Sequence, residues 1–173
     1  LEGVPWVMPI EAFFESWVET ILQSLARRTG GNLSIGRKHQ TGRSIEWTPS
    51  YLGSQRSLVP DLVVEWNDLT LIVDAKYKRH FEEIQRRSWT RIDDELREHH
   101  RHDLLQVIAY ANLARTARVI ACLTYPCSLE TWQSLRERGR LIHQAVFSTG
   151  TRSLTLWLTA VPMDDKTVPV VDS

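Results

Sequence analysis

The sequence has 173 residues, of which 42% are hydrophobic and 24% are charged, a composition typical of a folded protein with one core. The 21 Lys and Arg residues equal the 21 Asp and Glu residues in number, so the chain lacks the overall positive charge of many autonomous nucleic-acid binders. Any contact with DNA must therefore be local, or shared with partner proteins. We expect one domain over residues 1–165 and a frayed tail over residues 166–173.

Cysteine usage and hydropathy narrow the class of protein further. Cys122 and Cys127 are the only cysteines, which argues against a disulfide framework and a four-cysteine metal site, so we expect a reducing, cytoplasmic location. No apolar run approaches the roughly 20 residues that span a bilayer, and no signal pattern is present, so we expect no membrane partner. Because Leu1 stands just upstream of a helical pattern, we expect a domain cut from a longer chain.

The first predicted elements are a helix and two short strands. Apolar residues recur with helical spacing over positions 10–25, which predicts an amphipathic helix ended by Gly30 and Gly31. Leu33 and Ile35 indicate a first strand, and residues 45–47 indicate another short extended segment.

A β-hairpin is predicted next. Residues 58–66 and 69–77 are two β-rich runs separated by Asn67-Asp68, a pair that tolerates the positive φ angles of a tight two-residue turn. Side chains alternate along the second run, so Asp74 and Lys76 share one face while the other face is apolar.

The rest of the chain predicts further helices and strands. In order, these are a charged, partly helical stretch over 79–102, a buried helix over 103–113, an interior strand over 118–125 ended by Pro126, a short helix over 129–138 ended by Gly139, and strands over 142–147 and 153–159 joined by Thr149-Gly150. The order is therefore a helix, strands, a helix, a strand and extra strands, which predicts an α/β fold.

Three charged residues converge on the predicted hairpin. Asp61 stands near the start of its first strand, which the turn brings beside Asp74 and Lys76 at the end of its second strand. Two carboxylates can hold Mg²⁺, which polarises a phosphodiester and makes bound water acidic, while a lysine orients or helps deprotonate that water. The alternative is a strand-edge Asp61 beside an exposed Asp74–Lys76 ion pair.

Several sequence blocks resemble a known nuclease family. Pro60-Asp61 with Asp74-Ala75-Lys76 resembles the PD-(D/E)xK nuclease signature. More narrowly, four blocks over residues 5–125 resemble the nuclease part of the McrC family, from the McrBC modified-cytosine restriction system: Phe14-Glu15, Leu58-Val59-Pro60-Asp61, Ile72-Val73-Asp74-Ala75-Lys76-Tyr77-Lys78 and Asp103-Leu104-Leu105-Gln106-Val107-Ile108-Ala109-Tyr110.

The resemblance implies a fold and a set of site residues. The fold is a restriction-endonuclease-like core (α-β-β-β-α-β) with a mixed central sheet flanked by helices and extra C-terminal strands. The implied ligands of Mg²⁺, for which Mn²⁺ would substitute, are Asp61, Asp74, the carbonyl of Ala75 and Glu15, and Lys76 is the implied catalytic lysine. Glu15 has an alternative, because Glu11, Glu15 and Glu19 recur every four residues and could form a solvated helix face, with Glu11 as the substitute.

Gln106 and Tyr110 are four residues apart on one helix face, as in the Gln-x-x-x-Tyr element of several families of this superfamily. The resemblance implies that they approach the metal site or the DNA backbone. Alternatively, Asp103 and Gln106 form a helix-capping pair and Tyr110 belongs to the core.

Other polar clusters are weaker candidates. His99, His100 and His102 lack matching Cys or carboxylate spacing, so we expect them in a solvated loop. The Lys and Arg residues between positions 78 and 101 could contact phosphates, but they alternate with acidic residues, and helical surface ion pairs explain them equally well.

The sequence contains no G-x-x-x-x-G-K-[ST] phosphate loop, so a motor would have to be a separate chain. The resemblance therefore implies a Mg²⁺-dependent endonuclease for double-stranded DNA in a modified-cytosine restriction system, working with an AAA+ GTPase of the McrB type. Two alternatives stay open: a DNA repair or recombination nuclease of the same fold, and a catalytically silent interaction domain.

Overall fold

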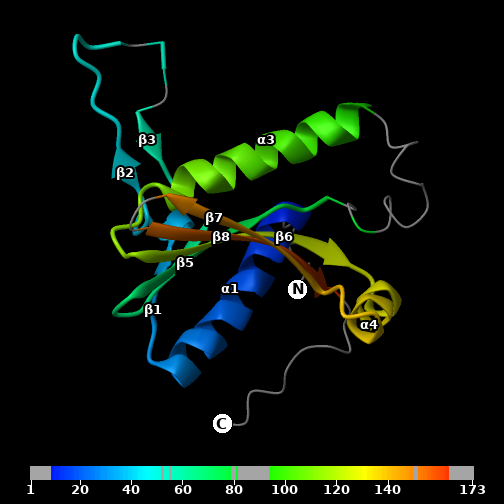
Figure 1. Ribbon diagram of the computed structural model, residues 1–173. Helices are drawn as coiled ribbons and strands as arrows, with labels where there is room; N and C mark the ends of the chain where they lie inside the picture. Colours follow the sequence, from blue (N-terminus) through cyan, green and yellow to red (C-terminus); the bar gives the residue numbers. More distant parts are fainter. Residues whose placement is uncertain are drawn as a thin grey trace, which may run out of the picture.

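A six-stranded mixed sheet forms the centre of the protein, in the strand order β1-β4-β5-β6-β8-β7 (Figure 1). Its strands are β1 (Asn32–Ile35), β4 (Leu62–Glu65), β5 (Leu69–Ala75), β6 (Arg118–Cys127), β7 (Ile142–Thr149) and β8 (Arg152–Pro162). A separate two-stranded sheet pairs β2 (Arg43–Ser44) with β3 (Ser57–Leu58). In the part of the chain that the structure describes, the helices are α1 (Ile10–Thr29), the 3-10 helix η1 (Gly36–Lys38), α3 (Asp94–Ala111) and α4 (Leu129–Glu137).

This computed structural model describes residues 9–51, 53–54, 56–78, 81, 94–149 and 152–163. Within the central sheet, β1, β4 and β5 are antiparallel neighbours, β5, β6 and β8 run parallel, and β7 pairs antiparallel with β8. The order α1, β1, β4, β5, α3, β6 confirms the predicted restriction-endonuclease-like α/β core, with β7 and β8 as the extra C-terminal strands. No helix in the described part of the chain is long and apolar enough to cross a membrane.

Helices α1 and α3 cover opposite faces of this sheet (Figure 1). The α1 face buries Phe14 and Val18 against Leu71 and Val73 of β5, while the α3 face buries Val107 against Ile72. Strand β5 is therefore buried on both sides, as expected for a strand with a parallel neighbour. The predicted division of β5 into one apolar and one polar face is thus wrong for most of its length.

Helix α1 confirms the predicted helix and its end. Gly30 adopts φ 69°, the left-handed conformation that favours glycine, and its N–H donates to the carbonyl of Ala26. The buried stripe is narrower than the predicted one, because it contains one residue per turn: Phe14, Val18, Leu22 and Ala26. The neighbouring apolar side chains Ile10, Phe13, Ile21 and Leu25 are exposed.

The predicted hairpin is present, with changes at both ends. The N–H of Trp66 donates to the carbonyl of Leu69 at 2.9 Å and closes the turn over Asn67-Asp68. This turn needs no positive φ, since His39 alone among the described non-glycine residues has one. Residues 57–58 leave the hairpin to pair with β2, which lies at residues 43–44 rather than at the predicted 45–47.

The second half of the chain follows the predicted order. Helix α3 begins at Asp94, so the helix predicted from residue 103 is longer, whereas residues 79–80 and 82–93 of the charged stretch lie outside the described part. Strand β6 continues through Pro126, where it was predicted to end. Proline is tolerated there because β5 ends opposite Thr124, so Pro126 pairs only with β8.

Three C-terminal elements agree with the sequence. Helix α4 begins after Ser128, whose side chain accepts a hydrogen bond from the N–H of Thr131, and Gly139 follows its end with φ 65°. Strands β7 and β8 pair from Thr149↔Arg152 back to Ile142↔Thr159, as the predicted hairpin requires. The predicted tail over residues 166–173 lies outside the described part of the chain.

Gly36 joins the first helix region to the hairpin. Its N–H donates to the carbonyl of Asp61 at 2.7 Å, and a Cβ at this position would collide with the carbonyl oxygen of Pro60. We predict that Gly36→Ala lowers the free energy of unfolding by about 1–3 kcal/mol, the usual cost of overpacking a buried position. In Gly42→Ala the nearest atom, in Val59, is 3.8 Å away, so the loss should stay below about 0.5 kcal/mol. Urea unfolding of both variants measures this difference, and equal losses would contradict the predicted collision.

Candidate active site

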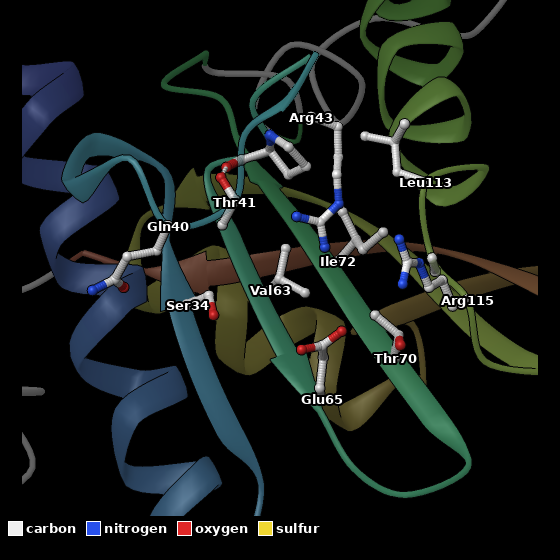
Figure 2. Close-up of a pocket in the computed structure, with 12 residues that line it drawn as sticks. Ser34, Gln40, Thr41, Arg43, Val63, Glu65, Thr70, Ile72, Leu113 and Arg115 are labelled. Carbon is white, nitrogen blue, oxygen red and sulfur yellow. Dashed lines mark hydrogen bonds between the residues drawn. The ribbon is translucent and has the colours of Figure 1, made fainter. Parts of the chain in front are cut away.

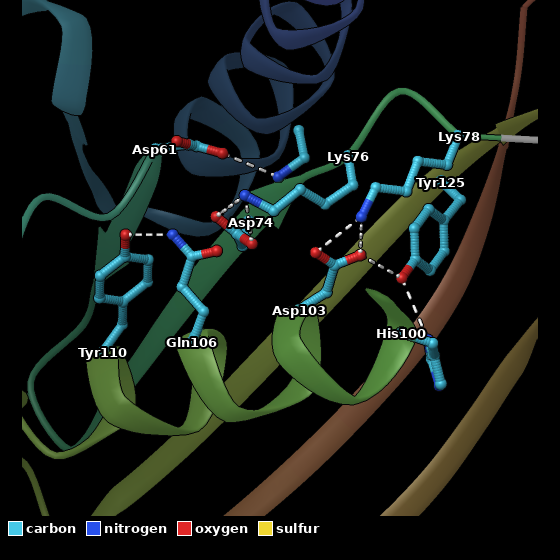
Figure 3. A network of polar contacts seen from close by, with 10 residues as sticks. Asp61, Asp74, Lys76, Lys78, His100, Asp103, Gln106, Tyr110 and Tyr125 are labelled. Atoms are coloured by element: carbon cyan, nitrogen blue, oxygen red, sulfur yellow. Dashed lines mark hydrogen bonds and ion pairs between the residues drawn. The ribbon is translucent and has the colours of Figure 1, made fainter. Parts of the chain in front are cut away.

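The end of the β4–β5 hairpin brings the three predicted acidic and basic residues together (Figure 3). Asp61 directly precedes β4, Asp74 is near the end of β5, and Lys76 follows that strand. The Oδ2 atom of Asp61 accepts a hydrogen bond from the N–H of Ala75 at 2.9 Å, which ties the two strands together at the site.

The Asp74 carboxylate is fully buried, with 0% of the residue exposed. The Nζ of Lys76 donates to Oδ1 at 3.2 Å and lies 3.0 Å from Oδ2, but its direction does not suit a hydrogen bond to Oδ2, which is left buried without a hydrogen-bond partner. Burial raises the pKa of Asp74 to about 7, the Asp61 charge adds to this rise, and Lys76 opposes it. The ionised form of Asp74 is therefore disfavoured in the fold, and a further positive charge beside it would reduce this cost.

Lys76 is the basic partner in this group, with 22% of its side chain exposed. Burial by itself lowers the pKa of Lys76, but the attraction of Asp74, supported by Asp61 and Asp103, outweighs burial, so the pKa is raised. Lys76 therefore stands in the site as an ammonium ion, able to donate hydrogen bonds to water or to phosphate oxygens.

Helix α1 places Glu15 next to Asp61. Both residues line a cavity of about 240 Å³ between α1, η1 and the start of β4. Burial raises the pKa of Glu15, and the charge of Asp61 raises it further. Glu19, one turn along, lines the same cavity, but its carboxylate is neutralised by ion pairs with Arg37 and with Lys38. The structure thus distinguishes these two members of the Glu11, Glu15 and Glu19 series, and it brings Glu15 to the acidic group.

Helix α3 supplies Gln106 and Tyr110 from the other side of the site (Figure 3). The Nε2 of Gln106 donates to the hydroxyl of Tyr110 at 2.7 Å. The Tyr110 ring belongs to the core, with 5% of the residue exposed, so the core alternative describes the ring correctly. The capping alternative is wrong, because Asp103 lies inside α3 rather than at its first turn.

A second polar network beside the site was missed from the sequence (Figure 3). The Nζ of Lys78 lies 2.9 Å and 2.6 Å from the two oxygens of Asp103, whose Oδ2 also accepts from the hydroxyl of Tyr125 at 3.0 Å. The Nδ1 of His100 lies 3.1 Å from that hydroxyl. The prediction that the three histidines lie in a solvated loop is wrong, because all three belong to α3 and His100 is partly buried.

One feature of the sequence could have indicated this network, namely the closeness of its charged residues to predicted site residues. Lys78 lies two residues after Lys76, and Asp103 lies one helical turn before Gln106, so both were adjacent to predicted site residues. Their pairing depends on α3 crossing the end of β5 and β6, which no local pattern reveals. The network anchors α3 to these strands and thereby positions Gln106 and Tyr110.

The donor atoms present can be compared with the needs of a divalent cation. Among the described residues, no group of three or more His, Cys, Asp and Glu side chains is arranged to hold a metal ion. Mg²⁺, however, binds commonly through one or two carboxylates, water and substrate phosphates. Asp61 and Asp74 meet that smaller requirement, and the buried Oδ2 of Asp74 has the Lys76 ammonium 3.0 Å away but no hydrogen-bond partner. The residues present therefore fit Mg²⁺ bound together with substrate.

We predict that Asp74→Asn makes the metal-free protein more stable at neutral pH. The pKa of Asp74 is raised from 3.8 to about 7 in the fold, so ionised Asp74 costs stability that is absent below pH 4 and complete above pH 7. The advantage of the variant in free energy of unfolding should grow over this window to roughly 2–4 kcal/mol and then level off.

Urea unfolding in EDTA from pH 4 to pH 8 measures this advantage. Asp68→Asn is the matched control, because this carboxylate is 69% exposed and its ion pair is with exposed Arg118, so its effect should stay within about 1 kcal/mol. An Asp74→Asn advantage that does not change with pH would contradict the raised pKa.

Comparison with known proteins identifies the family to which the chain belongs. A family model described as McrBC 5-methylcytosine restriction system component matches residues 2–126, which is more than half of the 173 residues and covers α1 through all of β6 except its last residue. No curated protein matches the chain. With the matched region containing every residue of the candidate site, the chain belongs to the family of McrBC 5-methylcytosine restriction system components.

Proposed function

We propose that this chain is a Mg²⁺-dependent endonuclease of the PD-(D/E)xK superfamily, acting on double-stranded DNA in the cytoplasm. Family membership connects it to a 5-methylcytosine restriction system that acts on DNA with partner subunits. The observation that carries the proposal is the buried Asp74 carboxylate, with one orphaned oxygen, beside Asp61 and the ammonium of Lys76. This arrangement costs stability in the absence of a further cation, and strongly perturbed carboxylates of this kind cluster at functional sites.

The proposed roles follow from the position of each residue. Asp61, Asp74 and the carbonyl of Ala75 would hold Mg²⁺ or Mn²⁺, and Glu15 would act from α1 at the same end of the hairpin. When bound, the cation would polarise the phosphodiester and lower the pKa of water. Lys76 would donate to the attacking water or to a phosphate oxygen, because its pKa is raised and it carries its proton.

Gln106 and Tyr110 have a supporting role in this proposal. Gln106 uses Nε2 to bind the Tyr110 hydroxyl, which leaves its amide oxygen on the side of Asp74 and Lys76 (Figure 3). The pair would hold a water or the DNA backbone next to the carboxylates. Target choice and movement along DNA would come from an AAA+ GTPase of the McrB type on another chain, since this sequence contains no phosphate loop.

We predict that Lys76→Ala reduces DNA cleavage at least about 100-fold, the usual minimum for removing a positioned donor from a hydrolytic site. The assay is conversion of supercoiled plasmid with Mg²⁺, run with the chain alone and with its GTPase partner and GTP. Arg28→Ala is a charge-matched control on the last turn of α1. Equal cleavage by Lys76→Ala and the wild type, or no cleavage under either condition, would refute the assigned site.

We predict that Mg²⁺ or Mn²⁺ raises the melting temperature of the wild type and not that of Asp74→Asn, because the variant lacks one of two anionic ligands. At 100 times the dissociation constant the cation should stabilise the fold by about 2.7 kcal/mol. Asp68→Asn should respond as the wild type does, since Asp68 lies at the hairpin turn, at the opposite end of β5. Stabilisation of equal size in Asp74→Asn would contradict the proposed ligand.

A further inference from the structure

A second, larger cavity of about 430 Å³ lies next to the candidate site, between the hairpin, β2 and the end of α3 (Figure 2). Val63 of β4 and Ile72 of β5 form its apolar floor. Charged side chains from three separate segments surround this floor: Arg43, Glu65 and Arg115. None of the residue roles described above uses this cavity.

The cavity continues the active-site face of the hairpin. Side chains alternate along β5, so Thr70 and Ile72, which line the cavity, share a face with Asp74. They lie roughly 13 Å and 7 Å from Asp74 along the strand. Phosphates of one DNA strand follow each other every few ångströms, so a duplex with one phosphate at Asp74 extends its next phosphates over this cavity or away from it.

The charges around the cavity favour a path of the DNA strand over the cavity. The guanidinium groups of Arg43 and Arg115 both point into the cavity, although 71 residues separate them in the sequence (Figure 2). Among the residues that the structure describes, neither forms an ion pair, and the only hydrogen bond of Arg43 there is a long one, 3.5 Å, to the carbonyl of Gly42. Two unpaired guanidinium groups facing one space repel each other and form a forked donor set for a phosphate.

Glu65 is the acidic side chain among the residues that line the cavity. Its carboxylate lies at the edge nearest the hairpin turn, away from the active site, and forms no ion pair with either arginine (Figure 2). A phosphate between the arginines would be repelled by Glu65. This residue is therefore a sensitive probe of whether an anion binds there.

We propose that Arg43 and Arg115 bind a phosphate of the DNA strand next to the one cleaved at Asp74, so that the cavity is a substrate subsite. The position relative to the cleaved bond rests on the proposed function, whereas the binding of a duplex phosphate does not. The subsite fixes the register of the DNA on the hairpin and supplies the local positive charge that the neutral overall composition lacks.

The test is binding of a fluorescent 20-base-pair duplex to the full chain in EDTA, at several salt concentrations between about 50 and 200 mM. Arg43→Ala and Arg115→Ala should each weaken binding about five- to tenfold, and the double variant should lower the salt slope by about one to two. Arg28→Ala, which removes an equal charge from the opposite face of the sheet, should change affinity less than about twofold. Glu65→Gln should tighten binding, because it removes the repelling charge. Both arginines are exposed, and melting temperatures verify that the variants fold.

Arginine variants that bind like Arg28→Ala, a Glu65→Gln variant that binds more weakly, or a wild type that does not bind the duplex would each overturn the subsite. The cleavage assay with Lys76→Ala separates this failure from failure of the proposed function. Lys76-dependent cleavage with no effect of the arginines refutes only the subsite. Arginine-dependent binding without Lys76-dependent cleavage refutes the nuclease assignment and retains the phosphate site.

Discussion

The burial of the Asp74 carboxylate is the constraint on which the site depends. A carboxylate with no solvent exposure must be paired or protonated, and here Lys76 forms an ion pair with Asp74 but donates a hydrogen bond to only one of its oxygens. Burial raises the pKa of Asp74 to about 7, and the charge of Asp61 beside it adds to this rise. The fold tolerates this cost at the end of a strand whose other residues are packed on both faces.

The packing of α3 helps to offset the cost of burying the Asp74 carboxylate. The helix lies across one face of the sheet and packs Val107 into the same core cluster as Ile72, two residues from Asp74. The Lys78–Asp103–Tyr125 network then fixes the helix to the strands through three hydrogen bonds to one buried carboxylate. The polar network and the apolar core therefore hold the same helix, and the position of Gln106 follows from both.

The two cavities both border the Asp61 loop, which consists of residues 59–61 between β3 and β4. The smaller one joins Asp61 to Glu15 and α1, while the larger one extends from Pro60 along the hairpin toward Arg43 and Arg115. The bonds from Gly36 to Asp61 and from Thr41 to Pro60 hold this loop between them. Displacement of the loop would therefore change both cavities and the acidic group together.

The sequence by itself determined the elements and the local part of the site. Alternation in a strand and helical spacing are local properties, so α1, the hairpin, the α3 helix and the pairing of Asp61 with Asp74 and Lys76 followed from residue order. Only the tertiary structure decided which side of each element is covered, because burial depends on neighbours distant in sequence. It therefore decided that Ile10 and Phe13 are exposed, that β6 passes Pro126, that Lys78 meets Asp103, and that Arg43 and Arg115 face one cavity.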